Sequence, residues 1–288
     1  MKRLLFFLLA CLPLCLPAGG RERPDELRLE VEFFADSLLA GRAMGSPGAQ
    51  AATFYLVRQL RDAGLQATVQ SFIADGRIGH NVVAVTPGHF SKYVVVSAYL
   101  DGLGTLDGTL YPGADANASG LAALLALARE FNDGRERMTG LVFVAFDGHN
   151  ADLSGSRAFL ERYRGLYPIS LMVNLDILGS TLAPVKKDRP NYLMALGGRE
   201  FWFNLESASF HADIDLTFDY YGSEAFTRIF YRQVSDQRWF LEAGIPSVMF
   251  TSGITMNTNK AADTPDTLDY DILDRRIRLI ARWLRMIL

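Results

Sequence analysis

The sequence predicts an α/β fold, a three-layer sandwich in which helices flank a central, mostly parallel mixed sheet. Two observations carry this prediction. Short runs rich in β-branched and aromatic residues alternate along the chain with longer stretches of helical periodicity, an order typical of parallel sheets. Several short runs are apolar at consecutive positions, as in strands buried on both faces. No linker or repeat interrupts the pattern, so we expect one domain over residues 21–288.

The elements follow from these two periods. The sheet should begin with a hairpin, because the first two strands meet around Asp75-Gly76, which is too short for a parallel crossover. Residues 181–191, which include Pro184 and Pro190, should form an exposed loop. The expected strands are residues 66–72, 81–85, 93–98, 141–146, 171–176, 192–196 and 247–251, and the expected helices are 31–39, 50–63, 119–131, 154–163, 200–210, 236–243 and 270–286.

The first twenty residues have the layout of a secretory signal peptide. Lys2 and Arg3 precede an apolar run over residues 4–16, and small residues follow at 18–20. Residues 8–11 also fit a bacterial lipoprotein signal, with Cys11 as the acylated residue. We therefore expect an exported bacterial protein that is periplasmic, secreted or anchored in the membrane as a lipoprotein. Cys15 is the only other cysteine, so residues 21–288 hold no disulfide and no thiol nucleophile.

Charge and composition exclude several classes of protein. With 29 Lys and Arg against 32 Asp and Glu, and a pI near 5.8, the chain lacks the basic character of a nucleic-acid-binding protein. No internal stretch reaches the ~18 apolar residues of a transmembrane helix. Neither a Gly-x-Ser-x-Gly elbow nor a phosphate-binding P-loop is present.

Polar residues gather where the expected strands end, which is where ligands bind in such sheets. The residues just past the strand ends are 99–101, 147–150, 176–179 and 251–253, and the loop 113–120 precedes a helix. Several short motifs occur at residues 39–48, 81–84, 112–120, 146–156, 174–176, 235–246 and 263–266. Their order and spacing resemble the zinc exopeptidases of metallopeptidase family twenty-eight, which include bacterial aminopeptidases and glutaminyl cyclases. The resemblance implies a zinc-exopeptidase fold and two zinc ions that share a carboxylate, with a Glu as general base.

Carried over residue by residue, the resemblance places few metal ligands on this chain. The histidine of the family's His-x-Asp segment becomes Tyr99, with Asp101 after it. The bridging Asp falls on Ala116, and the Glu-Glu pair of base and ligand falls on His149 and Asn150. Asp176 is retained, whereas the C-terminal histidine falls on Asn259.

These replacements decide the expected chemistry. A zinc site needs at least three protein ligands, and Ala116 offers no donor atom. Tyr99 ionises only near pH ~10. We therefore expect no metal and no other cofactor. The structural alternative for Asp101 and Asp176 is hydrogen bonding to Tyr99 or to backbone N–H groups, and Asp115 should point away if its loop keeps the family shape.

Three hypotheses on function remain open. The first is an exported, catalytically inactive exopeptidase-like protein that binds a peptide or protein through the former cleft. The second is an active aminopeptidase or amide hydrolase, with zinc or without metal, whose rebuilt site includes His149, Asp101, Asp115 and Asp176. The third is a structural or assembly role. The expected binding residues are Tyr99, Asp101, Asp115, Ala116, His149, Asn150, Asp176 and Asn259. Two aromatic sets are ambiguous: Tyr220, Tyr221, Phe226 and Phe230 fit a pocket mouth or the core, and Phe201, Trp202, Phe203 and Phe210 fit the core or a dimer contact.

Overall fold

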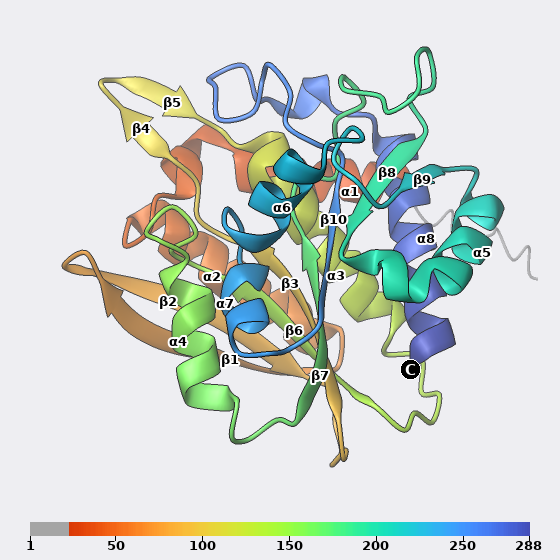
Figure 1. Cartoon of the computed structure of the whole chain (residues 1–288). Coiled ribbons are helices and arrows are strands. Elements are labelled where there is room, and N and C mark those ends of the chain that lie inside the picture. The colour runs from red at the N-terminus through yellow and green to blue at the C-terminus, as the bar shows by residue number, and fades with distance from the viewer. Residues whose placement is uncertain (1–22) are drawn as a thin grey trace, which may run out of the picture.

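The structure is a computed structural model that describes residues 23–288 (Figure 1). The predicted signal peptide and the lipid anchor at Cys11 therefore lie outside the described residues. Over the described part of the chain, none of the helices combines the length and apolar character needed to cross a bilayer.

An eight-stranded mixed sheet forms the centre of the fold, in the order β1-β2-β6-β3-β7-β10-β8-β9. Its four central strands run parallel to one another, and β2 and β8 join them antiparallel on either side. The predicted α/β three-layer fold is confirmed. The strands are β1 Gln66–Ala74, β2 Arg77–Val85, β3 Tyr93–Tyr99, β6 Gly140–Phe146, β7 Ile169–Leu175, β8 Tyr192–Leu196, β9 Asp215–Thr217 and β10 Ser247–Thr251.

The sequence patterns located the longer strands and missed the short ones. β1 and β2 form the expected antiparallel hairpin, which turns at Asp75 and Gly76. The three-residue strand β9 at the sheet edge was not predicted. Nor was the small separate hairpin of β4 Gly104–Leu106 and β5 Thr109–Tyr111. Strands of three residues contain too few alternations to give a periodic signal.

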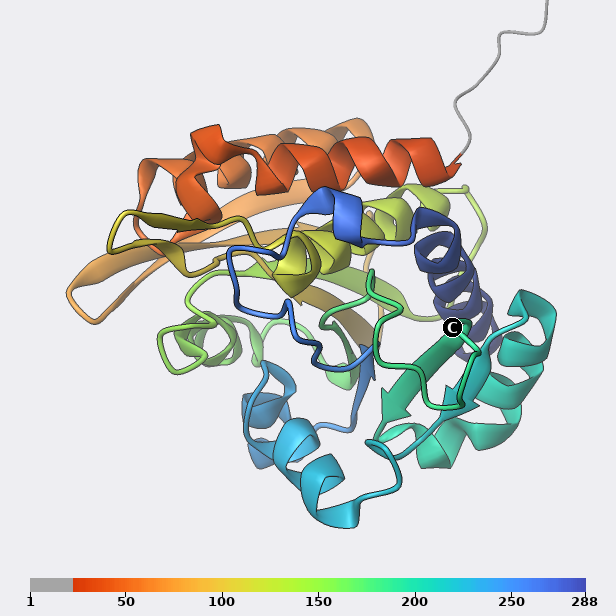
Figure 2. The same ribbon diagram turned by 90° about the horizontal axis from the view of Figure 1, so that it is seen from above.

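Helices cover both faces of the sheet because side chains alternate along each strand. Val94 and Val96 of β3 face the helices α1 Arg23–Ala35, α2 Pro47–Asp62, α3 Gly120–Glu130, α5 Trp202–Ala212 and α8 Tyr270–Ile287. Val95 faces the opposite layer, which contains α4 Ser154–Tyr163 and α7 Gln237–Glu242. On that side, α6 Glu224–Arg232 packs through Phe230 beneath β8. Figure 2 shows the layers from above.

The first helix differs most from its prediction. It begins at Arg23 and ends at Ala35, followed by a 3-10 turn over Ser37–Arg42, whereas residues 31–39 were expected. Pro24 and the acidic Asp25 and Glu26 occupy the first turn, a combination that favours a helix start. The unpredicted helix α6 is only nine residues long and buries none of them fully. A segment of this length has too few turns for its periodicity to stand out in the sequence.

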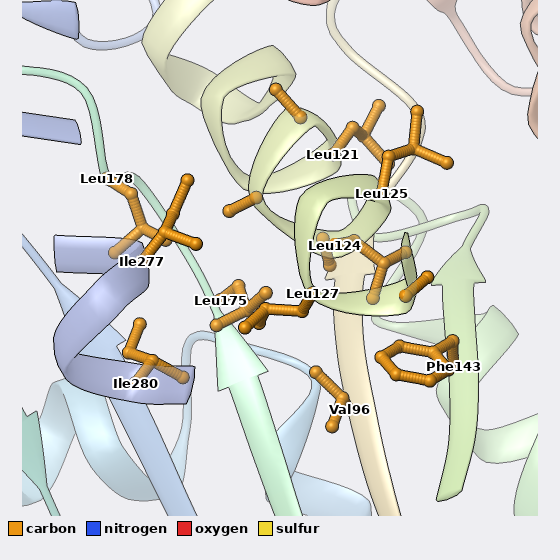
Figure 3. Packing of buried hydrophobic residues seen from close by; sticks show 14 of the residues in the cluster. Val96, Leu121, Leu124, Leu125, Leu127, Phe143, Leu175, Leu178, Ile277 and Ile280 are labelled. Carbon is orange, nitrogen blue, oxygen red and sulfur yellow. The ribbon is translucent and has the colours of Figure 1, made fainter. Parts of the chain in front are cut away.

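The largest hydrophobic core lies between the sheet and α3 (Figure 3). Leu121, Leu124 and Leu127 of α3 are fully buried and lie over β3, β6 and β7, with Ile277 and Ile280 of α8 alongside. This packing fixes the central strands, and therefore also the loops that leave their carboxyl ends.

Candidate functional site

The carboxyl ends of the four parallel strands bring the predicted site residues to one edge of the sheet. Tyr99 is the last residue of β3, Asp147–Asn150 follow β6, and Asp176 follows β7. Gly155, at the start of α4, keeps the turn after β6 compact, because a Cβ there would lie 2.0 Å from the carbonyl oxygen of Asp147. This is the edge at which parallel sheets bind ligands.

At the centre of this edge, the ring of Tyr99 stacks on the imidazole of His149. Their centroids lie 3.8 Å apart, and the planes differ by 14°. The side chain of Tyr99 is buried, and burial, followed by the charges of nearby Asp176 and Asp263, raises the pKa of its hydroxyl well above the usual value. Tyr99 is therefore neutral throughout the physiological pH range.

His149 is held by a carboxylate that the sequence prediction missed. Nδ1 of His149 lies 2.9 Å from Oδ2 of Asp236, the fully buried residue that precedes α7. Burial alone would lower the pKa of the imidazole, but the hydrogen bond to Asp236 and the charges of Asp236, Asp176 and Asp101 raise it to about 9. At neutral pH His149 is an imidazolium that donates its Nδ1–H to Asp236.

Asp101 binds the turn after β6. Its Oδ1 accepts the backbone N–H of His149 at 2.8 Å, and Oδ2 accepts the backbone N–H and the side-chain amide of Asn150 at 3.0 and 3.1 Å. Hydrogen bonding to backbone N–H groups is the structural alternative expected for this residue. Burial nevertheless raises the pKa of the Asp101 carboxyl.

Asp147 is a second buried carboxyl in the same turn. It accepts the backbone N–H of His80 at 2.8 Å. Burial and the charge of Asp101 raise its pKa to about 7.

Asp115 and Ala116 lie in the irregular turn before α3, where Asp263 holds the backbone. The two oxygens of Asp263 accept the N–H groups of Asp115 and Ala116 at 2.7 and 3.0 Å. The Asp115 side chain is directed toward the segment after β7, where Oδ1 accepts the N–H of Gly179 at 2.7 Å. Its Oδ2 is buried without a hydrogen-bond partner, and burial together with the charge of Asp263 raises the pKa of Asp115 to about 7.

Asp176 stands above a buried polar network. Burial raises the pKa of its carboxyl, although His149 and Ser235 oppose the shift. Below it, Asn174 donates to Oγ of Ser235 and to the side-chain oxygen of Gln237, both at 2.8 Å. This network ties β7 to the segment that carries Asp236, and so it sets the position of His149's partner.

Arg42 holds the loop after β3 and the loop before α3 together. It is fully buried and donates to the carbonyl oxygens of Leu100 and Gly113 at 3.1 Å, of Pro112 at 2.9 Å, and of Phe34. Burial lowers its pKa to about 10, so it stays charged at neutral pH. One guanidinium thus joins the loop after β3 to the loop before α3.

Asn150 and Asn259 lie at the solvent boundary. Asn259 is exposed in the loop between β10 and Asp263. Within residues 23–288, it makes none of the hydrogen bonds that hold Asp101, Asp115, His149 and Asp263. Asn150, with Asp101, borders a cavity of about 280 Å³. The cavity is also lined by Ala43, Met44, Asp75, Arg77, Gly102, Leu103, Leu106 and Ala151.

The donor set does not fit the zinc ions implied by the family resemblance. Across residues 23–288, no three His, Cys, Asp or Glu side chains are grouped so that they could hold a metal ion. Asp101 uses both oxygens and Asp115 uses Oδ1 on backbone N–H groups, and the one histidine at the centre is protonated. The side chains at this edge therefore support no chemical step through a metal.

Two acidic residues of the site escaped the sequence prediction. Asp236 and Asp263 stand in motifs that contributed to the resemblance, yet neither was assigned a role. The only local signal was the position of each beside a turn, because their partners lie 87 and about 148 residues away in the chain.

The fold and this polar edge define an α/β protein of the zinc-exopeptidase kind. The family model described as "Peptidase family M28" matches residues 81–284, more than half of the chain. The chain therefore belongs to peptidase family M28.

A curated relative and two solved structures agree with this assignment. The uncharacterized protein YfbL of Escherichia coli is 27% identical over 176 residues, which cover 57% of this chain and 53% of that protein. The zinc aminopeptidase BSAP of Bacillus subtilis superposes with a TM-score of 0.74 at 13% identity, covering 93% of this chain and 96% of that one. A glutaminyl cyclase of Porphyromonas gingivalis gives 0.70 at 17% identity, covering 92% and 98%.

The family model establishes the family, whereas the solved structures establish only the fold. The two structures share the fold with this chain, and their low identity says nothing further about activity. The chain spans about half the length of the first curated relatives it matches.

Proposed function

We propose that this member of family M28 is a non-hydrolytic protein that binds a peptide through the edge of the sheet where the family's catalytic site lies. One observation carries the proposal: the imidazole of His149 is stacked on Tyr99 and paired with Asp236. His149 stands where the resemblance places the general base, and a base must be unprotonated to accept a proton. With a pKa of about 9, His149 is already protonated at neutral pH.

The donor set supports the same conclusion. Hydrolysis in this family requires a polarised carbonyl and an ionised water, and zinc supplies both. The positions that correspond to ligands hold Tyr99, Ala116, Asn150 and Asn259, and Asp176 alone retains a carboxylate. Losing the metal and the base together removes terms that are each worth factors of about a hundred to a thousand in rate.

A peptide is the ligand class that fits the cavity beside Asp101. Met44, Leu103 and Leu106 supply apolar surface, whereas Asn150 offers an amide that can both donate and accept. Asp75 and Arg77 add one charge of each sign. A few polar groups set in an apolar lining are typical of small-ligand sites.

Activity and metal content give the first test. The protein purified with zinc present should hold far less than one zinc per chain, and chelation should leave its melting temperature unchanged. Hydrolysis of aminoacyl-anilides and cyclisation of N-terminal glutamine should stay at background. Any rate that is unchanged in His149→Ala is contamination. A chelator-sensitive rate that disappears in this variant would show that the proposal is wrong.

Binding gives the second test, with a tripeptide library as the probe. We expect peptides that raise the melting temperature of the wild type but not that of Asn150→Ala or Arg77→Ala. Arg162→Gln, an exposed substitution on α4, should respond as the wild type does. A library without a single Asn150-dependent binder would contradict a peptide-binding role.

Amide hydrolysis by a rebuilt, metal-independent site is the second candidate. The observation that favours it is the 2.9 Å contact between His149 and Asp236, since a carboxylate that orients a histidine recurs in acid–base catalysis. Against it, the Asp115 side chain turns toward Gly179, and His149 is a poor base. Chelator-resistant hydrolysis that is lost in His149→Ala would establish it.

Export is part of the proposal and rests on residues 1–20 alone. The basic start, apolar run and small residues favour secretion, with acylation at Cys11 as the variant that anchors the chain. The mass of the protein isolated from its host decides between a cut after residue 20, a lipid on Cys11 and an unprocessed chain. The last result would contradict export by this route.

A further inference from the structure

A cavity of about 620 Å³ lies between α1, α3 and α8, away from the polar edge of the sheet. We call it the arginine cavity because five arginines line it: Arg23, Arg129, Arg278, Arg282 and Arg285. Glu26 and Glu130 are the acidic residues of the lining. Three helices that are distant in sequence thus bring five guanidinium groups around one opening.

Ion pairs hold four of these arginines in place. Arg23 bonds Glu130 and Asp274, and Arg129 bonds Glu30. Arg285 bonds Glu130 and Asp133, and Arg278 bonds Asp274. These pairs join the three helices and neutralise most of the charge around the cavity.

The pairs nevertheless leave many N–H donors unused. A guanidinium carries five donors, of which Arg278 uses one side-chain bond, from Nε to Asp274. Arg282 is exposed on α8, and no carboxylate of residues 23–288 lies within 4.0 Å of it. A purely structural network accounts for Arg23 and Arg129, but it gives Arg282 no role. Forked guanidinium donors match the oxygens of a phosphate group.

The neighbouring helix α5 exposes large aromatic side chains. Its inner side packs against α8 through Leu205 and Ala208, and the two helices lie side by side in Figure 1. On the outer side Trp202, Phe203 and Phe210 are 58%, 70% and 84% exposed. Phe201 instead packs on the core, against Trp283. Exposed aromatic rings beside a basic helix are typical of proteins that lie at a membrane interface.

The chain enters the fold at the same place. Arg23 lines the cavity and is the first described residue, and the apolar run of residues 4–16 precedes it in sequence. If Cys11 carries a lipid, the chain from Cys11 to Arg23 spans at most about 43 Å. The arginine cavity would then remain within reach of the lipid headgroups.

We propose that the arginine cavity and the exposed aromatic rings of α5 form a surface that docks on an anionic membrane, with the phosphate of a lipid headgroup in the cavity. The chain as a whole has a net charge of −3, so attraction to anionic lipid must come from this one surface rather than from the overall charge of the protein. Binding therefore needs both the guanidinium groups and the aromatic rings, and it weakens as salt screens the charges.

Vesicle binding by the full chain tests this docking. We compare vesicles of equal parts phosphatidylglycerol and phosphatidylcholine with vesicles of pure phosphatidylcholine, at about 0.1 M salt. The ratio of the two affinities removes the contribution of the apolar N-terminal run, which all variants share. Arg278→Gln with Arg282→Gln should lower the preference for anionic vesicles by about 30-fold. The matched control, Arg162→Gln in the last turn of α4 with Arg164→Gln just after the helix, should leave this preference unchanged.

The aromatic side has its own matched pair. Phe203→Ser with Phe210→Ser should weaken binding to both kinds of vesicle, because ring insertion does not depend on lipid charge. Phe54→Ser with Leu38→Ser, at two exposed positions outside α5, should have no effect. All substituted side chains are exposed, so circular-dichroism melting should report intact folds.

Several outcomes would overturn the proposal. One is equal affinity of the wild type for both vesicle types, and another is an arginine variant that matches its control. If inorganic phosphate raises the melting temperature through Arg278 and Arg282 without any preference for anionic vesicles, the cavity binds a soluble phosphate and the membrane assignment is wrong. If the α5 variant instead converts a dimer into a monomer in sedimentation velocity, a second copy of the chain covers this face.

Discussion

His149 Nδ1 lies 2.9 Å from Oδ2 of Asp236, and this contact joins the turn after β6 to the start of α7. It is a charged pair inside a site that also contains Asp101 and Asp176. The excess of carboxylates keeps the imidazole protonated, so the pair acts as a structural link that also sets the charge of the polar edge.

The first prediction is that Asp236→Asn lowers the pKa of His149 from about 9 to its ordinary value of ~6.5 or below. Without the Asp236 charge, burial favours the neutral imidazole. Histidine NMR titration measures the shift. Asp152→Asn removes an exposed carboxylate from the same turn and should leave the pKa in place. An unchanged pKa in Asp236→Asn would mean that the ion pair does not determine the protonation of His149.

The second prediction concerns stability against pH. The pKa of His149 is higher in the folded than in the unfolded chain, so its contribution is complete below pH ~6.5 and is lost as the pH rises through about 9. The free energy of unfolding should fall by about 3 kcal/mol more in the wild type than in His149→Gln over this range. Urea unfolding at both ends of the range measures this difference. Parallel curves for the two proteins would contradict the prediction.

The third prediction is that Asp115→Asn stabilises the fold at alkaline pH. The folded pKa of Asp115 is raised to about 7, so the wild type loses stability as the pH rises from ~4 toward 8. An Asn keeps the Oδ1 acceptor for Gly179 and removes the buried charge on the unpartnered Oδ2. Relative to the wild type, the variant should gain up to about 4 kcal/mol between these two pH values.

Asp133→Asn is the contrasting control for Asp115. Despite some burial, Arg285 and Arg137 hold the pKa of Asp133 at about 2. Its charged form therefore stabilises the fold, and that contribution is lost only as the pH falls through about 2. Removing this carboxylate should never stabilise the protein at pH 8. Chemical denaturation of both variants checks the opposite signs.

The fourth prediction is that Arg42→Lys destabilises the fold by about 2–4 kcal/mol. An ammonium group cannot reproduce the fork that reaches four carbonyl oxygens from three segments of the chain, and each buried carbonyl left without a donor is costly. Arg58→Lys, at a side chain 81% exposed, is the control and should be neutral. A cost below about 1 kcal/mol for Arg42→Lys would show that the loops hold together without the guanidinium.

Most of the fold could be predicted because it follows from local patterns. β3 and β6 are apolar at nearly every position, and the structure buries every residue of both. The helix α6 was missed because its nine residues make only about two and a half turns, too short a stretch for a helical period to be read with certainty. The start of α1 was missed for another reason: its signals, Pro24 and Asp25, lie just after the expected signal peptide.

The candidate site could be predicted in position but not in its pairings. The rule that ligands meet at the carboxyl ends of parallel strands placed Tyr99, Asp101 and Asp176 at one edge. Whether a carboxylate faces a histidine or a backbone N–H depends on loops that meet only in the folded chain. Asp236 and Asp263 are the clearest cases, because each binds a residue from a distant loop.

The last prediction concerns the rebuilding of a metal site. A zinc site needs three donors that act together, and Ala116→Asp alone would add one carboxylate near Asp176. We therefore expect no zinc binding by calorimetry in the wild type or in any single reversion. The combined variant, which should bind zinc, carries Tyr99→His, Ala116→Asp, His149→Glu, Asn150→Glu and Asn259→His. It also replaces His149 and so leaves Asp236 without its partner. A parallel version therefore adds Asp236→Asn to avoid an unpaired buried charge. Zinc binding by Ala116→Asp alone would show that the present donors already form most of a metal site, contrary to the arrangement of Asp101 and Asp115 described above.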